Sequence, residues 1–117
     1  MMERKKKRLR KNWQFKQVFG QGRSAATREI VFYFLANNLG FNRTGFVTSK
    51  KLGVAVVRNR VKRVMREAYR TWEGQLPKGF DMVFVARPAA VGRDFQRIVA
   101  EMKLVLCRAG LFPRETR

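Results

Sequence analysis

The segment from Val54 to Trp72 shows the clearest periodicity in the sequence. Its apolar residues recur at intervals of three and four, which is the spacing of one face of an α-helix. These residues are Val57, Val61, Val64, Met65, Ala68, Tyr69 and Trp72. Because an apolar stripe of this length must be buried against another element, the segment predicts a long helix packed onto a folded domain.

Several other segments have the composition of β-strands. Residues 29–35 and 80–86 are rich in β-branched and aromatic side chains, which favour extended structure. Residues 37–40 contain two asparagines and a glycine, a turn signal, and residues 44–49 follow as a second strand. We therefore expect the strands before and after this turn to form a β-hairpin. A further short strand is expected near residues 24–27.

The strand at residues 29–35 carries apolar side chains on both of its faces. Such a strand is usually buried on both sides of a sheet. The alternative is that one aromatic face stays open, so that nucleobases can stack on it. The pattern favours burial and leaves the open face as the second interpretation.

Two shorter helices are predicted near the ends of the chain. Asn12 is a candidate N-cap for a helix in which Phe15, Val18 and Phe19 share one face. A final helix is expected at residues 94–109. Its inward-facing residues would be Phe95, Ile98, Val99, Met102, Val105 and Leu106. The resulting order, α-β-β-β-α-β-α, is typical of a small α+β domain in which helices pack on one sheet.

The chain has 117 residues, a length that suits one domain. We expect this domain at residues 12–112. Residues 4–11 contain seven basic residues in eight positions, and because like charges repel, residues 1–11 predict a flexible basic arm. Residues 113–117 predict a short C-terminal tail.

Positive charge dominates the composition. There are 27 Lys and Arg residues against 8 Asp and Glu residues, a formal net charge of +19. Such a surplus is typical of proteins that bind a polyanion, most often nucleic acid. Since 45% of the residues are hydrophobic, the chain is expected to have a packed core rather than to be a disordered basic tail.

The residue types exclude several kinds of catalytic or metal site. The chain has no histidine, which removes imidazole bases and histidine metal ligands. Cys107 is the single cysteine, which excludes an internal disulfide and a cysteine-based zinc site. None of the carboxylates forms a D-x-D or E-x-x-E pair, and several are expected on exposed helix faces next to Lys or Arg. We assign no catalytic residue, no metal ligand and no protein-bound organic cofactor to this chain.

No segment predicts export or membrane insertion. The longest apolar run is residues 30–36, whereas a membrane helix needs roughly 20 residues. The basic N-terminus is not followed by an apolar stretch of signal-peptide length. We expect a cytoplasmic protein that does not bind a membrane.

A second side of the helix at residues 54–72 is basic. Six cations share this helix with only two carboxylates, Glu67 and Glu73, so salt bridges cannot balance their repulsion. A solvated surface is the alternative interpretation, but the planar fork of arginine binds phosphate oxygens well, which favours a polyanion. The six cations are Arg58, Arg60, Lys62, Arg63, Arg66 and Arg70.

The same region resembles the signature of the bacterial ribonuclease P protein subunit. The pattern is S-K-K-x-G-x-A-x-x-R-N-R-x-K-R-x-x-R at residues 49–66. The R-L pair at residues 8–9 and F-x-x-V-F-x-x-G at residues 15–22 resemble the first helix of that family. F-D-M-V at residues 80–83 and A-R-P at residues 86–88 resemble its last strand and the exit from it. The resemblance covers nearly the whole chain.

The resemblance implies a ribonucleoprotein that removes the 5′ leader from precursor tRNA. In that family an RNA subunit hydrolyses the phosphodiester bond with Mg²⁺, and the small basic protein helps to bind the substrate. The implied partners are the RNA subunit and precursor tRNA, with no obligate protein partner. The implied fold is an α-β sandwich with a left-handed β-α-β crossover, which opposes the usual right-handed preference.

The resemblance also implies roles for individual residues. Phe15, Phe19 and Tyr33 match the aromatic cleft that receives the single-stranded leader, where bases can stack. Helical spacing makes Phe15 and Phe19 core residues about as readily, whereas the hydroxyl of Tyr33 favours a wet surface. A structural ribosomal protein or an RNA chaperone is the alternative function, since the charge and fold would suit it too. The residues that match the RNA-binding motif are Lys50, Lys51, Arg58, Asn59, Arg60, Lys62, Arg63 and Arg66.

Overall fold

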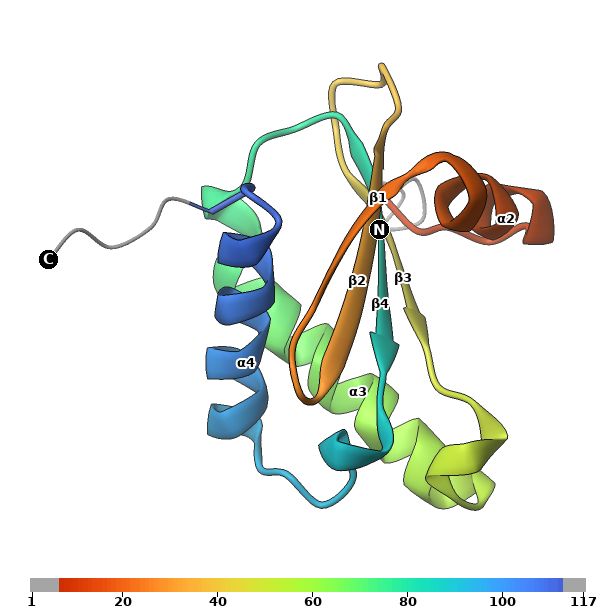
Figure 1. Cartoon of the computed structure of the whole chain (residues 1–117), viewed down its shortest axis with the longest axis vertical. Helices are drawn as coiled ribbons and strands as arrows, with labels where there is room; N and C mark the ends of the chain where they lie inside the picture. The colour runs from red at the N-terminus through yellow and green to blue at the C-terminus, as the bar shows by residue number, and fades with distance from the viewer. Residues whose placement is uncertain (1–6, 113–117) are drawn as a thin grey trace, which may run out of the picture.

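A four-stranded β-sheet forms the centre of the computed structural model, which describes residues 7–112 (Figure 1). The strands are β1 (Arg23–Ala26), β2 (Ile30–Ala36), β3 (Arg43–Val47) and β4 (Phe80–Ala86). They lie in the order β1-β2-β4-β3. β2 is antiparallel to both of its neighbours, whereas β3 and β4 are parallel.

Helices cover both faces of this sheet. They are α2 (Asn12–Gln21), α3 (Ala55–Trp72) and α4 (Phe95–Arg108). Figure 1 views the sheet from its edge, with α2 on one side and α3 and α4 on the other. The α+β class and the order α-β-β-β-α-β-α are confirmed, including the short strand expected near residues 24–27. Within residues 7–112, no helix is long and apolar enough to span a membrane.

The hairpin predicted within residues 29–49 is wrong. β4 lies between β2 and β3 and pairs with both of them. The loop after β2 is attached to the start of β4, because Asn37 N donates to Gly79 O at 2.8 Å. In the same loop, Asn42 Oδ1 accepts from Phe80 N at 2.9 Å. Six of the seven side chains of β4 are apolar and five are buried, which is typical of a central strand covered on both faces.

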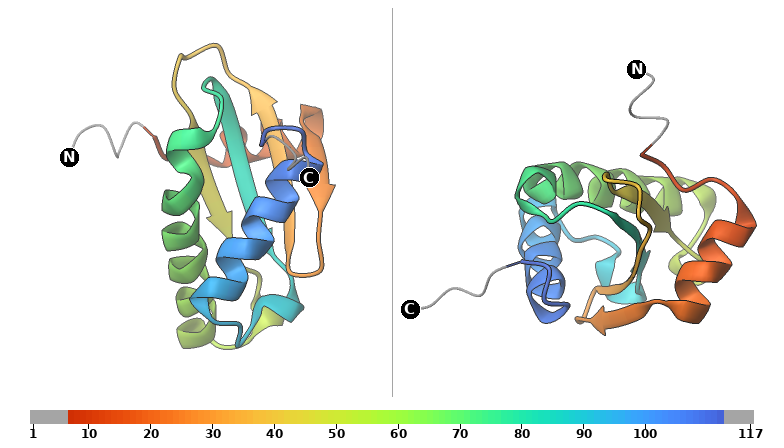
Figure 2. Two further views of the ribbon diagram at one scale, coloured as in Figure 1. Left: turned by 90° about the vertical axis from the view of Figure 1, so that its left-hand side faces the viewer. Right: turned by 90° about the horizontal axis from the view of Figure 1, so that it is seen from above.

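The parallel strands β3 and β4 are neighbours joined through α3, so the three elements form a β-α-β unit. In the left view of Figure 2, α3 lies in front of the sheet, both strands point downward, and β4 lies to the right of β3. This arrangement is a left-handed crossover, as the family resemblance implied, against the usual right-handed preference.

The larger core lies between the sheet and the helices α3 and α4. Phe32 and Phe84, on adjacent central strands, stack at its middle with their ring centroids 4.6 Å apart. Most of the apolar stripe predicted for α3 faces this core, which confirms the amphipathic interpretation. Of that stripe, the fully buried residues are Val61, Met65, Ala68 and Tyr69, and the half-buried ones are Val57, Val64 and Trp72.

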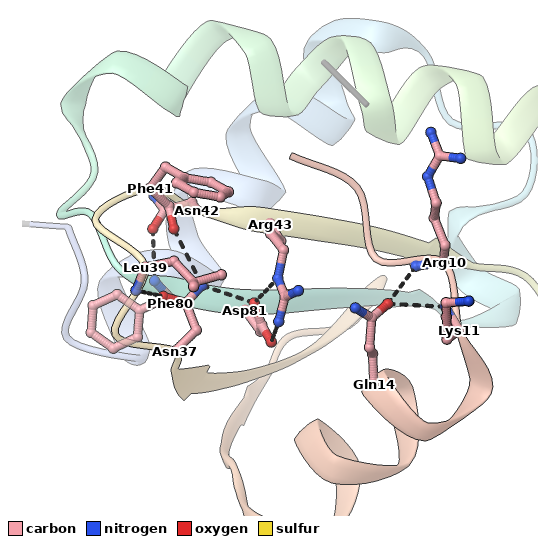
Figure 3. Close-up of polar contacts among 10 residues, drawn as sticks. All are labelled: Arg10, Lys11, Gln14, Asn37, Leu39, Phe41, Asn42, Arg43, Phe80 and Asp81. Carbon is pink, nitrogen blue, oxygen red and sulfur yellow. Dashed lines mark hydrogen bonds and ion pairs between the residues drawn. The ribbon is translucent and has the colours of Figure 1, made fainter. Parts of the chain in front are cut away.

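Two predictions at helix ends are wrong. Asn12 is the first residue of α2, and Lys11 takes the N-cap position instead. Gln14 supplies the capping contact, since its Oε1 accepts from Lys11 N at 2.9 Å (Figure 3). Phe95, predicted to face the core, is 40% exposed because it lies in the first turn of α4, ahead of the buried positions that begin at Ile98.

Residues 7–10, called here the N-terminal segment, lie along the outer edge of β3. Leu9 N donates to Thr44 O and Thr44 N donates to Lys7 O, each at 2.9 Å. Leu9 is buried in a smaller core between α2 and the sheet. This part of the predicted arm is therefore attached to the sheet, because Leu9 provides an apolar anchor inside the basic run. The first six residues of the predicted arm and the predicted tail lie outside the described residues.

A buried ion pair joins the parallel strands at the end where they begin. Asp81 is 4% exposed and accepts two hydrogen bonds from the Arg43 guanidinium, at 2.8 and 2.7 Å (Figure 3). The hydrogen bonds from Arg43 to Asp81, together with the charge of the carboxylate, raise the pKa of Arg43 above its ordinary value. Asn37 donates to the same carboxylate at 2.9 Å. This cluster fixes the loop after β2 to the β3–β4 pair.

A second buried cluster attaches α4 to the turn between β1 and β2. Glu29 Oε2 pairs with Arg93 at 3.1 Å and with Arg97 at 3.0 Å. Glu101 is also buried, and it accepts a hydrogen bond from Glu29 N at 3.4 Å. Burial alone would raise the pKa of Glu101, but hydrogen bonds from Thr27 and Glu29 outweigh it and lower the pKa. The sequence pattern predicted neither burial nor this role.

We expect Asp81→Asn to lower the free energy of unfolding by about 3 kcal/mol, because it leaves the mostly buried Arg43 without a counter-charge. The matched control, Glu67→Gln, removes an exposed pair with Arg70 and should cost less than about 1 kcal/mol. Urea unfolding at neutral pH measures both variants. Equal losses for the two would contradict a structural role for the buried pair.

Candidate nucleic-acid interface

The cations of α3 lie on the part of the helix that the core does not cover. Because the apolar stripe is buried, these cations lie on the outer side of the helix. We call them the basic surface of α3. Within residues 7–112, Arg70 is the only cation of this helix with an ion pair, to Glu67 at 2.9 Å. Arg58 Nε is buried and has no hydrogen-bond partner among these residues. The exposed members of the predicted set are Asn59, Arg60 and Arg63, and the half-buried ones are Arg58, Lys62 and Arg66.

Lys50 and Lys51 are exposed in a 3₁₀ turn, Lys50–Leu52, which precedes α3. Gly53 follows with a φ of +136°, a conformation that favours glycine, and the chain then enters the helix. The first turn of α3 has no acidic residue, so the positive end of the helix dipole is not neutralised there. The two lysines thus add to a positive region that continues into the basic surface of α3.

The pKa of Arg66 is lowered by its surroundings on this surface. Its guanidinium lies 5.9 Å from the centre of the Phe46 ring and is partly covered by the protein. Burial first, and then the neighbouring cations Arg8 and Arg70, lower the pKa of Arg66, while Glu67 opposes the shift. Neighbouring like charges repel each other, and a bound anion would offset this repulsion.

The aromatic residues of the predicted leader cleft lie between α2 and the sheet. Phe19 is 43% exposed and meets Tyr33 edge-on, with ring centroids 4.9 Å apart. Phe15 is half-buried against Gly45, where an added Cβ would lie 2.4 Å from the Phe15 ring. The structure therefore brings Phe19 and Tyr33 together as an accessible pair and places Phe15 partly in the smaller core. The open-face alternative for β2 holds in part, since Tyr33 is half-buried rather than buried.

The F-x-x-V-F-x-x-G pattern at residues 15–22 has a packing explanation. Val18 is fully buried in the smaller core. A Cβ on Gly22 would lie 2.5 Å from Val18 O and 2.6 Å from Phe34 O, so only glycine allows α2 to end this close to β2. The pattern thus positions Phe19 over the sheet, next to Tyr33.

A groove of about 480 Å³ lies between the N-terminal segment, β3 and α3. Phe15 of the aromatic site and Lys62 and Arg66 of the basic surface all line it, so it joins the two predicted sites. Arg8 and Arg10 also line it, although the sequence placed them in a flexible arm. Leu9, the apolar residue between these two arginines, was the sequence signal that could have located them, because it anchors the N-terminal segment. Residues 7–112 contain no cluster of three or more Asp, Glu or Cys side chains that could hold a metal ion.

A family model for ribonuclease P matches residues 2–110. The chain belongs to the ribonuclease P protein family. The protein component of ribonuclease P from Thermoanaerobacter sp. (strain X514) is 40% identical over 111 residues, covering 95% of this chain and 96% of its own. The component from Alkaliphilus metalliredigens is 42% identical over 105 residues, covering 84% of this chain and 95% of its own.

Solved ribonuclease P proteins have the same fold. A Staphylococcus aureus RNase P protein mutant with defective mRNA degradation activity superposes with a TM-score of 0.86 and 34% identity, covering 95% of this chain and 94% of its own. The Thermotoga maritima RNase P protein superposes with a TM-score of 0.79 and 33% identity, covering 86% of this chain and 96% of its own. The chain is thus a subunit of the ribonuclease P holoenzyme, which removes the 5′ leader from precursor tRNA. The ribosomal or chaperone alternative is not favoured.

The two phenylalanines of this ribonuclease P protein should differ in their contribution to stability. We expect Phe15→Ala to lower the free energy of unfolding by about 3 kcal/mol, near the lower end for a buried phenylalanine, because its ring packs on Gly45. Phe19→Ala should cost clearly less, since the ring is 43% exposed. Thermal and urea unfolding measure both. A larger loss of unfolding free energy for Phe19→Ala than for Phe15→Ala would mean that Phe19, and not Phe15, belongs to the core.

Proposed function

We propose that the basic surface of α3 binds the RNA subunit of ribonuclease P, with Lys50 and Lys51 extending the contact. The observation that carries this proposal is the lack of ion-pair partners for most of the α3 cations within residues 7–112. Arginine binds phosphate oxygens through its planar fork, and contacts of this kind do not depend on base sequence. Most of these cations have no carboxylate partner in the described part of the protein. The phosphates of a folded RNA subunit would supply the missing negative charge.

We propose that Phe19 and Tyr33, with Phe15 beside them, receive the 5′ leader of precursor tRNA. Every base has a π-face, so an aromatic platform can bind a strand of variable sequence. The accessible edge-on pair of Phe19 and Tyr33 supports this role. Phe15 contributes mainly by supporting the platform, because its ring is held against Gly45.

We also propose that the Mg²⁺ used in the reaction is bound by the RNA subunit. The chemistry of the protein carboxylates supports this assignment. Asp81 is neutralised by Arg43 and Glu29 by Arg93 and Arg97, so neither is available to bind a divalent cation. The protein would then act by holding the two RNA molecules in place. Its partners would be the RNA subunit and precursor tRNA, with no obligate protein partner, and its compartment the cytoplasm.

The leader proposal is tested by Tyr33→Ala in the reconstituted holoenzyme. The variant should bind precursor tRNA with several leader nucleotides more weakly by about 1–3 kcal/mol, because one stacking contact is lost. Its affinity for mature tRNA, which has no leader, should not change. Equilibrium binding of both RNAs, with melting temperatures measured on the same preparations, gives the comparison.

Phe95→Ala is the matched control for this experiment. Phe95 is 40% exposed, much like Phe19, but it lies on α4, across the sheet from α2 (Figure 1). The control should leave the preference for precursor over mature tRNA unchanged. If Tyr33→Ala also keeps the full preference while remaining folded, the aromatic pair does not bind the leader.

A further inference from the structure

The two edges of the sheet differ in what covers them. The outer edge of β3 is occupied by the N-terminal segment, through the two hydrogen bonds with Thr44. β1 forms the opposite edge and pairs only with β2. In the left view of Figure 2, β1 is the last strand at the right of the sheet. Among residues 7–112, no other segment pairs with the outer side of β1, so this edge is open.

The register of β1 shows which backbone groups point outward from this edge. Thr27 N donates to Ile30 O at 2.8 Å, which makes these two residues a hydrogen-bonded pair. Such pairs alternate in an antiparallel ladder, so the exposed Ser24 and Ala26 turn their N–H and C=O groups away from β2. Arg108 Nη1 donates to Ala26 O at 2.8 Å, as expected for an outward carbonyl. Ser24 N, Ser24 O and Ala26 N have no hydrogen-bond partner in the described part of the chain.

The side chains around this edge are basic. Arg23 begins β1 and lies 5.8 Å from the centre of the Phe34 ring. Arg28 is exposed in the turn after β1, and Arg108 reaches the edge from the last turn of α4. None of these three arginines has an ion-pair partner within residues 7–112. The buried Glu29 does not neutralise them, because it pairs with two other arginines.

These charges select the kind of strand that can pair with β1. Basic side chains on an edge strand oppose pairing with a second copy of the same chain, because like charges would meet. An acidic strand would instead place opposite charges next to each other across the new pair. RNA phosphates could use only the outward donors, whereas the N–H and C=O of Ser24 together match the backbone of an extended polypeptide.

The two faces of the sheet define the side chains that an added strand would need. Ser24 is opposite Tyr33 in the register and shares with it the face toward α2. Arg23 lies over Phe34, on the face toward α4, from which Arg108 also reaches the edge. Side chains of an added strand alternate between these faces. The segment that fits has apolar residues on the α2 face and acidic residues on the α4 face.

We propose that the open edge of β1 binds an extended segment of a partner protein in which acidic and apolar residues alternate. Its backbone pairs with Ser24 and Ala26, and its carboxylates pair with Arg23 and Arg108. α3 contacts β3 and β4, whereas α4 contacts β1 and β2, so the added strand leaves the basic surface of α3 free. This partner is additional to the proposed RNA contacts, and the proposal does not rest on them.

The probe for this site is a short capped peptide in which valine and glutamate alternate, with valine at its centre. Bound to the full-length protein, it should slow amide hydrogen exchange at Ser24 and Ala26, because both N–H groups enter a ladder. Exchange at Leu9 N, which is bonded on the other edge of the sheet, should not change. The matched control peptide has lysine in place of glutamate and should not bind.

Two changes remove a backbone contact without altering any charge. Ser24→Pro deletes an outward N–H, and because proline is tolerated on edge strands at such positions, the melting temperature should stay close to that of the wild type. Methylation of the central amide nitrogen of the peptide removes the matching donor and leaves the protein unchanged. Each change should weaken peptide binding by about tenfold in a calorimetric titration.

Arg23→Glu tests the charge of the site, and Arg60→Glu makes the same charge change on the exposed side of α3. Arg23→Glu should weaken binding of the acidic peptide by at least about tenfold, since an attraction becomes a repulsion. Arg60→Glu should have a much smaller effect on the peptide. It should instead weaken binding to a bacterial ribonuclease P RNA, and a failure of that result would count against the proposed function of α3 and not against the β1 site.

Three results would overturn the proposal. The first is that the acidic peptide leaves exchange at Ser24 and Ala26 unchanged. The second is that the methylated peptide and the Ser24→Pro variant bind as tightly as the unmodified pair, because charge alone would then explain the association. The third is that the RNA subunit displaces the peptide in the reconstituted holoenzyme, or that oligouridylate slows exchange at the same amides, since the edge would then belong to RNA.

Discussion

Burial of the apolar stripe of α3 against the sheet determines where the cations of this ribonuclease P protein point. Tyr69 packs within 5.7 Å of Phe84 and 6.1 Å of Phe46, measured between ring centroids, and burial of its hydroxyl raises the pKa of Tyr69. With this side of the helix fixed, the remaining positions carry Arg60 and Arg63 into solvent and Lys62 and Arg66 to the margin of the groove. The position of the basic surface of α3 is therefore a consequence of the core, because helical periodicity places the cations away from the buried apolar stripe.

The distribution of carboxylates strengthens this effect. The sequence has only eight acidic residues, and three of them, Glu29, Asp81 and Glu101, are buried. There they hold α4 and the loop after β2 in place, through Arg43, Arg93 and Arg97. Acidic residues used inside the fold cannot neutralise the surface of α3. In the proposed complex, the phosphates of RNA would supply the counter-charge that offsets the remaining repulsion between these cations.

Local pattern was enough to predict the elements of this fold, but not how they pair. The helix at 54–72 and the strand at 80–86 were predicted nearly to the residue, because periodicity and β-branched composition are local properties. The hairpin was wrong because β4, which is more than thirty residues away in sequence, inserts between β2 and β3. Composition alone would also not indicate the left-handed crossover; the resemblance to a known family implied it.

The candidate site was predictable where charge was concentrated and unpredictable where it depended on contacts between distant segments. The cations of α3 follow from one helix. The N-terminal segment looked like a flexible arm because its charge outweighs the single apolar Leu9, yet that residue attaches it to β3. Phe15 and Phe19 could be separated only by the structure, since Gly45 receives one ring and leaves the other exposed.

The central claim is that this chain binds and positions RNA while the RNA subunit performs the hydrolysis. The most direct test is cleavage of a precursor tRNA over a Mg²⁺ titration by the protein alone, by a bacterial ribonuclease P RNA alone, and by the two together. We expect no cleavage by rigorously RNA-free protein at any Mg²⁺ concentration, and a lower Mg²⁺ requirement for the reconstituted holoenzyme than for the RNA alone. Correct 5′ processing by the protein without RNA would contradict the account.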